Sequence, residues 1–167
     1  MGKLYGRAML DHDPLALFSL KELLLRLGLA SVIGLLLGLD REMRGHEAGI
    51  RTHALVALSS AMIMMSSLIL SQQLRGDGFA PDPLRAIQGL SQAIGFIAAG
   101  LIFVRGGLVR NMTTAANIWV AAAIGIACGA GQYALVAVGA GLALALLTLL
   151  KLFERYLPAD KIDEERD

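Results

Sequence analysis

The sequence has a single cysteine, Cys128, among its 167 residues. One cysteine cannot close an intrachain disulfide, and its apolar surroundings favour the role of a small packing residue. Charged residues are also scarce, at 17% of the chain, and they nearly cancel to a net charge of +1. The chain therefore lacks the strong positive field that attracts nucleic acid. We expect neither a disulfide-stabilised domain nor a nucleic-acid-binding protein.

The sequence also lacks the motifs of nucleophilic and phosphate chemistry. It contains no Gly-x-Ser-x-Gly segment, no phosphate-binding loop and no recognised Cys/His metal spacing. His46, Glu47 and His53 could be drawn together as a metal site, but two histidines seven residues apart on a glycine-containing loop match no zinc spacing. We therefore expect no enzyme activity and no cofactor.

Apolar sequence is abundant and comes in long blocks. Hydrophobic residues make up 56% of the chain, and the mean hydropathy is +0.62. Blocks of about 17 to 25 apolar residues are long enough to cross a bilayer. The pattern predicts an all-α, polytopic transmembrane bundle of about five spans, the lipid bilayer being its immediate partner. The candidate spans are residues 23–39, 54–70, 87–104, 112–127 and 133–150.

These blocks divide the chain into an N-terminal segment (1–22), a transmembrane domain (23–150) and a charged tail (151–167). The N-terminal segment lacks a long apolar centre followed by a cleavage site, so we expect no signal peptide. The fourth span has polar residues in its first half and is the weakest; it could be tilted, interfacial or broken. The larger share of Arg and Lys falls on one side and predicts an N-out, C-in orientation.

A charged segment, residues 38–53, separates the first two apolar blocks. In the expected orientation it shares the inner face with the loop at 105–114. Charges at a membrane boundary tend to pair, so Asp40 could pair with Arg51 or Arg110, and the remaining arginines could bind a carboxylate or phosphate. The alternative is a cationic rim held by structural salt bridges. The candidate residues are Asp40, Arg41, Glu42, Arg51, Thr52, His53, Arg110, Thr113 and Thr114.

A second polar set lies on the outer side and within the spans. It consists of Asp82, Arg85, Gln88, Gln92 and Asn117. Residues 85, 88 and 92 share one helix face, which could line a wet cavity or bond a neighbouring helix. The Asn117 amide needs a partner, and we expect it to face Gln92 or the second span, which carries Ser59, Ser66 and Gln73 at seven-residue spacing. Asp40 and Asp82 are weak candidates for a transient Mg²⁺ contact.

Small residues recur at four-residue spacing in several spans. Such stripes allow helix backbones to approach closely in lipid. They indicate either contacts within one bundle or the interface of a homodimer or larger homo-oligomer. The predicted packing glycines are Gly34, Gly38, Gly95, Gly125 and Gly129. Ala137, Gly141 and Ala145 form a comparable stripe in the last span.

Three ordered segments resemble the signatures of the MgtC/SapB membrane proteins. They are Gly34 to Glu42 with Ala48 to Val56, then Asp82 to Arg85 with Gln88 and Gly95 to Gly100, and finally Val109 to Gly125. The likeness runs over roughly residues 23 to 150. The family usually has Glu where Asp40 stands, Gly-Leu where Asn111-Met112 stand, and often Thr at the place of Asn117.

The resemblance implies a multi-pass protein of the bacterial inner membrane, tied to magnesium-limited growth. Family members were named magnesium transporters, whereas MgtC is now described as a regulator that inhibits the F-type ATP synthase and supports survival inside host cells. MgtC carries a soluble C-terminal domain, and this sequence resembles the short SapB-like form without it. We expect a regulator that binds another integral membrane complex; the alternative is an oligomeric transporter of Mg²⁺ or another small solute.

Overall fold

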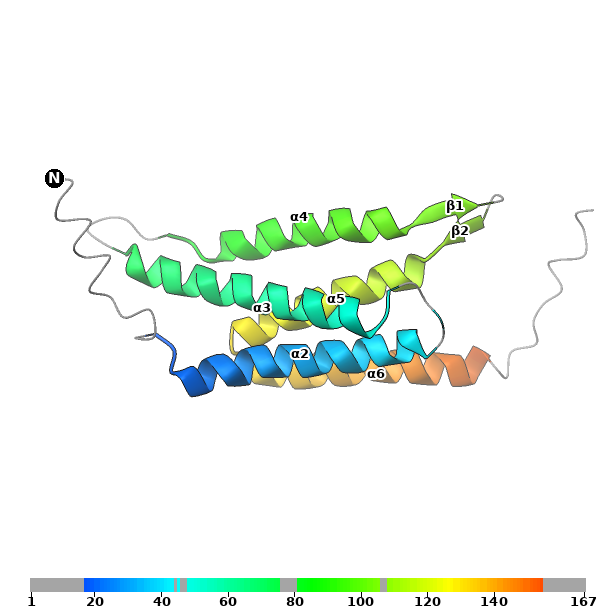
Figure 1. Ribbon diagram of the computed structural model, residues 1–167, viewed down its shortest axis with the longest axis horizontal. Coiled ribbons are helices and arrows are strands. Elements are labelled where there is room, and N and C mark those ends of the chain that lie inside the picture. The colour runs from blue at the N-terminus through cyan, green and yellow to red at the C-terminus, as the bar shows by residue number, and fades with distance from the viewer. Residues whose placement is uncertain (1–16, 44, 46–47, 76–80, 106–107, 155–167) are drawn as a thin grey trace, which may run out of the picture.

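The computed structural model describes residues 17–43, 45, 48–75, 81–105 and 108–154 (Figure 1). Most of the predicted N-terminal segment and tail, together with His46 and Glu47, lie outside these residues. The described helices are α2 (Leu20–Glu42), α3 (Ile50–Gln73), α4 (Leu84–Leu101), α5 (Met112–Gly129) and α6 (Tyr133–Glu154). The prediction of an all-α bundle is confirmed.

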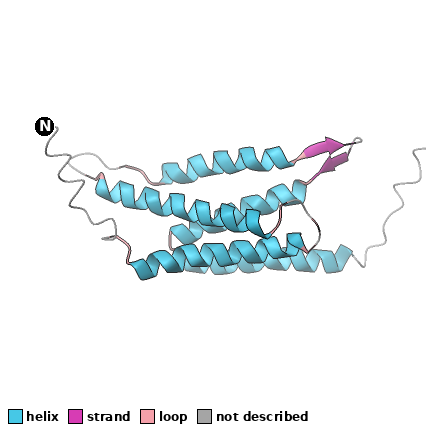
Figure 2. Cartoon of the chain, in the orientation of Figure 1, coloured by secondary structure: helices cyan, strands magenta, loops and turns pink. Residues whose placement is uncertain are grey.

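One element was not predicted. Strands β1 (Phe103–Arg105) and β2 (Leu108–Arg110) form an antiparallel hairpin between α4 and α5, with Phe103 opposite Arg110 and Val104 opposite Val109 (Figure 2). Successive helices run in opposite directions, so the α2–α3 connection, the β hairpin and the end of α6 lie at one end of the bundle (Figure 1). We call this the hairpin end. It brings together the described residues of the segments 38–53 and 105–114, as the sequence predicted.

Three of the helices, α2, α3 and α5, are long and apolar enough to cross a membrane. The possibility that the fourth candidate span is broken is wrong, because α5 is continuous over 18 residues, whereas a tilted or interfacial position stays a prediction. Helix α5 is also the most buried of the three. Two of its polar residues, Thr114 and Asn117, are buried against neighbouring helices, whereas Thr113 is exposed. The predicted N-out, C-in orientation stays a prediction.

Glycine pairs on α2 and α5 hold these helices close to α3. A Cβ atom added to Gly34 would lie 2.7 Å from the carbonyl oxygen of His53, and one on Gly38 would lie 2.6 Å from Cα of Ile50. On α5, a Cβ at Gly125 or Gly129 would lie 2.2 and 2.6 Å from the carbonyl oxygens of Ala57 and Ala61, respectively. All four contacts are with α3 backbone, so these stripes act within one bundle.

The other small-residue positions behave differently. A Cβ on Gly95 or Gly141 would meet no atom of the described residues within 4 Å. Of the two alternatives for the small-residue positions, close contact within one bundle therefore does not apply at Gly95 or Gly141, and contact with another copy stays a prediction there. Spacing alone identifies a smooth helix face, whereas the fold decides whether a neighbour lies against it.

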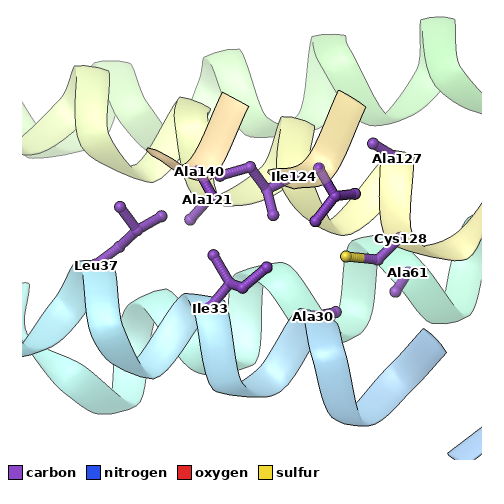
Figure 3. Packing of buried hydrophobic residues seen from close by; sticks show 10 residues of the cluster. Ala30, Ile33, Leu37, Ala61, Ala121, Ile124, Ala127, Cys128 and Ala140 are labelled. Carbon is purple, nitrogen blue, oxygen red and sulfur yellow. The ribbon is translucent and has the colours of Figure 1, made fainter. Parts of the chain in front are cut away.

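The main core lies between α2, α5 and α6. Ile33 and Leu37 of α2 face Ile124 and Cys128 of α5, with alanines filling the narrow gaps (Figure 3). Cys128 is fully buried among these side chains, which confirms its role in packing. At the far end of α5, the Arg26 guanidinium donates a hydrogen bond of 2.7 Å to the carbonyl oxygen of Gly129.

Arg26 thus closes the C-terminal end of α5, where carbonyl groups lack helical partners and a cation is favoured. It also forms an ion pair with Glu22 and lies 4.4 Å from the centre of the Phe18 ring. No role was predicted for Arg26, since nothing in the sequence indicates which distant helix end its side chain reaches.

Candidate functional site

Four buried polar side chains meet at the hairpin end. They are Arg41 from α2, His53 from α3, and Thr114 and Asn117 from α5, and none is more than 4% exposed. We call them the polar lock. In helices of a membrane protein, polar groups at such depth are costly unless they are paired with one another. Their connections explain why each is tolerated.

Arg41 extends from the last turn of α2 towards α5. Its guanidinium donates a hydrogen bond to the hydroxyl oxygen of Thr114. The two residues are 73 positions apart in the chain, so this contact joins the end of α2 to the start of α5. The arginine is therefore part of the interior rather than of a solvated cationic rim.

His53 joins α3 to α5. Its Nδ1 lies 2.8 Å from the carbonyl oxygen of Gly49, and its Nε2 lies 3.0 Å from the Asn117 amide nitrogen. Because a carbonyl oxygen can only accept, Nδ1 carries the proton and Nε2 accepts a hydrogen bond from Asn117. Thr114 and Asn117 are one turn apart, so one face of α5 bonds both Arg41 and His53.

Glu42 lies outside the polar lock and binds the N-terminus of α3. Its Oε2 accepts a hydrogen bond of 3.0 Å from the backbone N–H of Ile50, the first residue of α3. A carboxylate at a helix N-terminus is favoured by the unpaired N–H groups and the helix dipole. A Cβ on Gly49 would lie 1.6 Å from this oxygen, so a side chain at position 49 would displace the carboxylate.

Asn111 begins α5 in a left-handed conformation, with φ of 65°. Asn adopts this conformation more readily than most residues with a side chain, and Gly adopts it most readily. Its side-chain amide also donates a hydrogen bond of 3.3 Å to the carbonyl oxygen of Leu101. The MgtC/SapB signature usually has Gly at this position, and Asn111 can adopt the same backbone conformation.

The remaining inner candidates lie around the lock. Arg51, Arg110 and Thr113 are exposed, whereas Asp40 and Thr52 are half-buried. The hairpin end thus has a sealed polar interior and an exposed rim that carries arginine. Predicted pairing of Asp40 with Arg51 or Arg110 stays a prediction.

The second predicted polar set is split by the fold. Gln88 and Gln92 are exposed on α4, whereas Asn117 is buried against α3, so the predicted pairing of Asn117 with Gln92 is wrong. Contact of Asn117 with the second span is confirmed, but Ser59, Ser66 and Gln73 are all exposed. The buried polar face of α3 lies one residue further on, at His53 and Ser60.

The two aspartates considered for Mg²⁺ lie at opposite ends of the bundle, Asp40 at the hairpin end and Asp82 before α4 (Figure 1). Among the residues that the structure describes, no group of three or more His, Cys, Asp or Glu side chains is placed to hold a metal ion. Chemically, the lock offers a guanidinium, a hydroxyl, an amide and a neutral imidazole, a set suited to hydrogen bonding between helices.

The profile of the MgtC family matches residues 27–156, a segment that contains every residue of the polar lock. The chain belongs to the MgtC family. With three helices able to span a bilayer, this MgtC-family chain is a membrane protein. In a search of solved structures, no structure matches it.

Curated relatives share this segment. A protein of Escherichia coli strain K12, named "Putative magnesium transporter YhiD", is 40% identical over 127 residues, which cover 75% of this chain and 59% of YhiD. MgtC of Brucella abortus strain 2308 is 38% identical over 122 residues, covering 73% and 48% of the two chains. MgtC of Salmonella typhimurium strain LT2 is 40% identical over 111 residues, which cover 66% of this chain and 44% of that protein. The chain thus spans about half the length of these relatives.

Proposed function

We propose that this MgtC-family chain is a non-enzymatic regulator in the bacterial inner membrane that serves magnesium homeostasis by binding another integral membrane complex. The link to magnesium comes from the family and from the name of its relative YhiD. The F-type ATP synthase is the partner that the family precedent implies.

The observation that carries this proposal is that the polar side chains of the lock are buried and hydrogen-bonded between helices. Its four side chains are at least 96% buried and are directed at one another. A path for Mg²⁺ needs oxygen ligands and room for the waters that the ion retains. The family signature instead holds helices together, which leaves the outer surfaces of the bundle for function.

One exposed surface suits a protein partner. Arg51 and Arg110 are exposed at the hairpin end, close to the start of α3 and α5. Guanidinium groups bind carboxylates in a bidentate manner and are frequent in protein interfaces. We propose that this arginine rim contacts acidic side chains of the membrane complex.

A second candidate function is transport of Mg²⁺ or another small solute by an oligomer. It is favoured by the exposed polar residues of α4, because Gln88 and Gln92 could line a path between copies of the chain. The two proposals differ in whether the protein alone moves an ion.

Purified full-length chain in vesicles that enclose a Mg²⁺-sensitive dye is expected to give no Mg²⁺ influx above that of empty vesicles.

In native membranes, crosslinking is expected to capture a membrane complex, and Arg51→Ala with Arg110→Ala should lower the yield about ten-fold, as expected for two interface charges. The control is Lys21→Ala with Arg75→Ala, which removes two exposed charges at the other end. Mg²⁺ influx that Asp40→Asn abolishes would instead establish transport.

A further inference from the structure

Helix α4 has two contrasting faces. Leu90, Ile94 and Ala98 are buried against the rest of the bundle. At 3.6 residues per turn, the nearly opposite side of the helix carries an exposed set that we call the α4 stripe. Its members are Arg85, Gln88, Gln92, Phe96 and Ala99, all of them exposed.

Helix α4 is not among the three described helices that are apolar enough to cross a membrane by themselves, but it lies beside two of them, α3 and α5. Helix α4 runs beside α3 and α5 between the same two ends of the bundle (Figure 1), and its 18 residues span about 27 Å, close to the ~30 Å thickness of the hydrocarbon core. Gln92 stands at the middle of this helix. An amide facing lipid there would lose its hydrogen bonds, so glutamines in such positions normally bond another helix.

We propose that the α4 stripe binds α4 of a second copy of this chain. Two copies inserted in the same direction can only be related by an axis normal to the membrane, so a two-fold pair brings identical residues together. Each glutamine amide carries both a donor and an acceptor, so Gln88 and Gln92 can each pair with their own counterpart. Near the start of the helix, Asp82 and Arg85 are exposed and carry opposite charges, so Asp82 of one copy can pair with Arg85 of the other.

The shape of the surface supports self-association. Phe96 is 83% exposed and protrudes from one flank of the stripe. On the other flank, a groove of about 460 Å³ runs between α4 and α5, lined by glycine and alanine together with Ile102, Met112 and Trp119. In a pair of parallel helices, opposite flanks of the two copies meet, as the e and g positions do in a coiled coil. Phe96 of each copy therefore enters the groove of the other, against Gly95 and Ala99.

This self-association is independent of the regulator proposed above, because a dimer could serve either regulation or transport. Disulfide crosslinking of the full chain in native membranes tests it, in a Cys128→Ala background. Gln88→Cys and Ala99→Cys are expected to form covalent dimers at least about five times as efficiently as Leu142→Cys, a position on α6 that is also exposed. Equal yields at all three positions, or capture of a different membrane protein by Ala99→Cys, would overturn the proposal.

A second measurement separates folding from association. Gly95→Leu should leave the protomer folded, because a Cβ at Gly95 meets no atom within 4 Å, yet its side chain fills the groove that receives Phe96. In vesicles of phosphatidylethanolamine and phosphatidylglycerol, the dimer association constant from single-molecule photobleaching is expected to fall about ten-fold for Gly95→Leu and for Gln92→Leu. Gly141→Leu, at an equally open glycine on α6, is the matched control. Unchanged association of both stripe variants would contradict the α4 interface.

Discussion

Replacing Gly125 with alanine is expected to lower the free energy of unfolding by about 3 kcal/mol, the upper part of the range for overpacking a core. The new methyl carbon would lie 2.2 Å from the carbonyl oxygen of Ala57 and 2.9 Å from Cβ of Ser60. The first of these is backbone of α3, which cannot turn aside as a long side chain would. The helices must separate, and the hydrogen bond of Asn117 with His53 two turns away would lengthen.

Reversible unfolding of the full chain in mixed micelles, followed by circular dichroism, measures this loss. The matched control is Gly141→Ala, since the same methyl group there meets no atom within 4 Å. It is expected to leave stability unchanged or to raise it by up to about 1 kcal/mol, because alanine favours the helix over glycine. Equal unfolding midpoints for the two variants would show that α3 and α5 are not in close backbone contact.

Replacing Arg41 with alanine is expected to lower the free energy of unfolding by about 2 to 3 kcal/mol. Arg41 is 4% exposed, and its guanidinium donates to the fully buried hydroxyl of Thr114. Truncation removes a charge-assisted hydrogen bond and leaves a cavity between α2 and α5. Arg51→Ala, on the exposed side of α3, should change the same quantity by less than about 0.5 kcal/mol.

The Arg41→Lys variant tests whether charge alone suffices. Lysine keeps the positive charge but lacks the planar, forked set of donors, so we expect a stability between those of the wild type and Arg41→Ala. The same unfolding assay measures all three arginine variants. If Arg41→Ala and Arg51→Ala had equal effects, Arg41 would belong to the exposed rim and the polar lock would not exist.

Much of the fold follows from the sequence, because block-like hydropathy and short polar breaks define the helices and their order. The glycine pairs on α2 and α5 were also predictable, since small residues four positions apart make a smooth face. At Gly95 the same signal does not mark a contact within the described chain, because an added Cβ would meet none of its atoms within 4 Å. Whether a smooth face meets its own bundle or another molecule depends on tertiary arrangement.

The members of the candidate site were predictable, but their partners were not. His53, Thr114 and Asn117 stand out as polar residues in or beside apolar blocks. Ser59 and Ser60 illustrate the difficulty: both belong to seven-residue series on α3, but Ser59 is exposed and Ser60 is fully buried. One residue rotates a side chain by about 100° around the helix, and local sequence does not indicate which rotation faces α5.

The β hairpin and the contacts of Arg26 were missed for a related reason. Strands of three residues lie below the length at which alternation can be recognised. The bond from Arg26 to the carbonyl oxygen of Gly129 joins residues 103 positions apart, and a carbonyl group leaves no signal in the sequence.

The central claim is that the polar residues of the family signature form a buried interior that excludes water rather than a hydrated path. Two adjacent threonines test this claim most directly. Thr113 is exposed and Thr114 is fully buried, and Cys is close to Thr in size. In a Cys128→Ala background, reaction of Thr113→Cys and Thr114→Cys with a water-soluble thiol reagent would be followed in vesicles open to the reagent from both sides. The lock predicts modification of Thr113→Cys alone, at least about ten times faster than Thr114→Cys. Comparable rates at the two positions would mean that water reaches the interior, and would contradict the account.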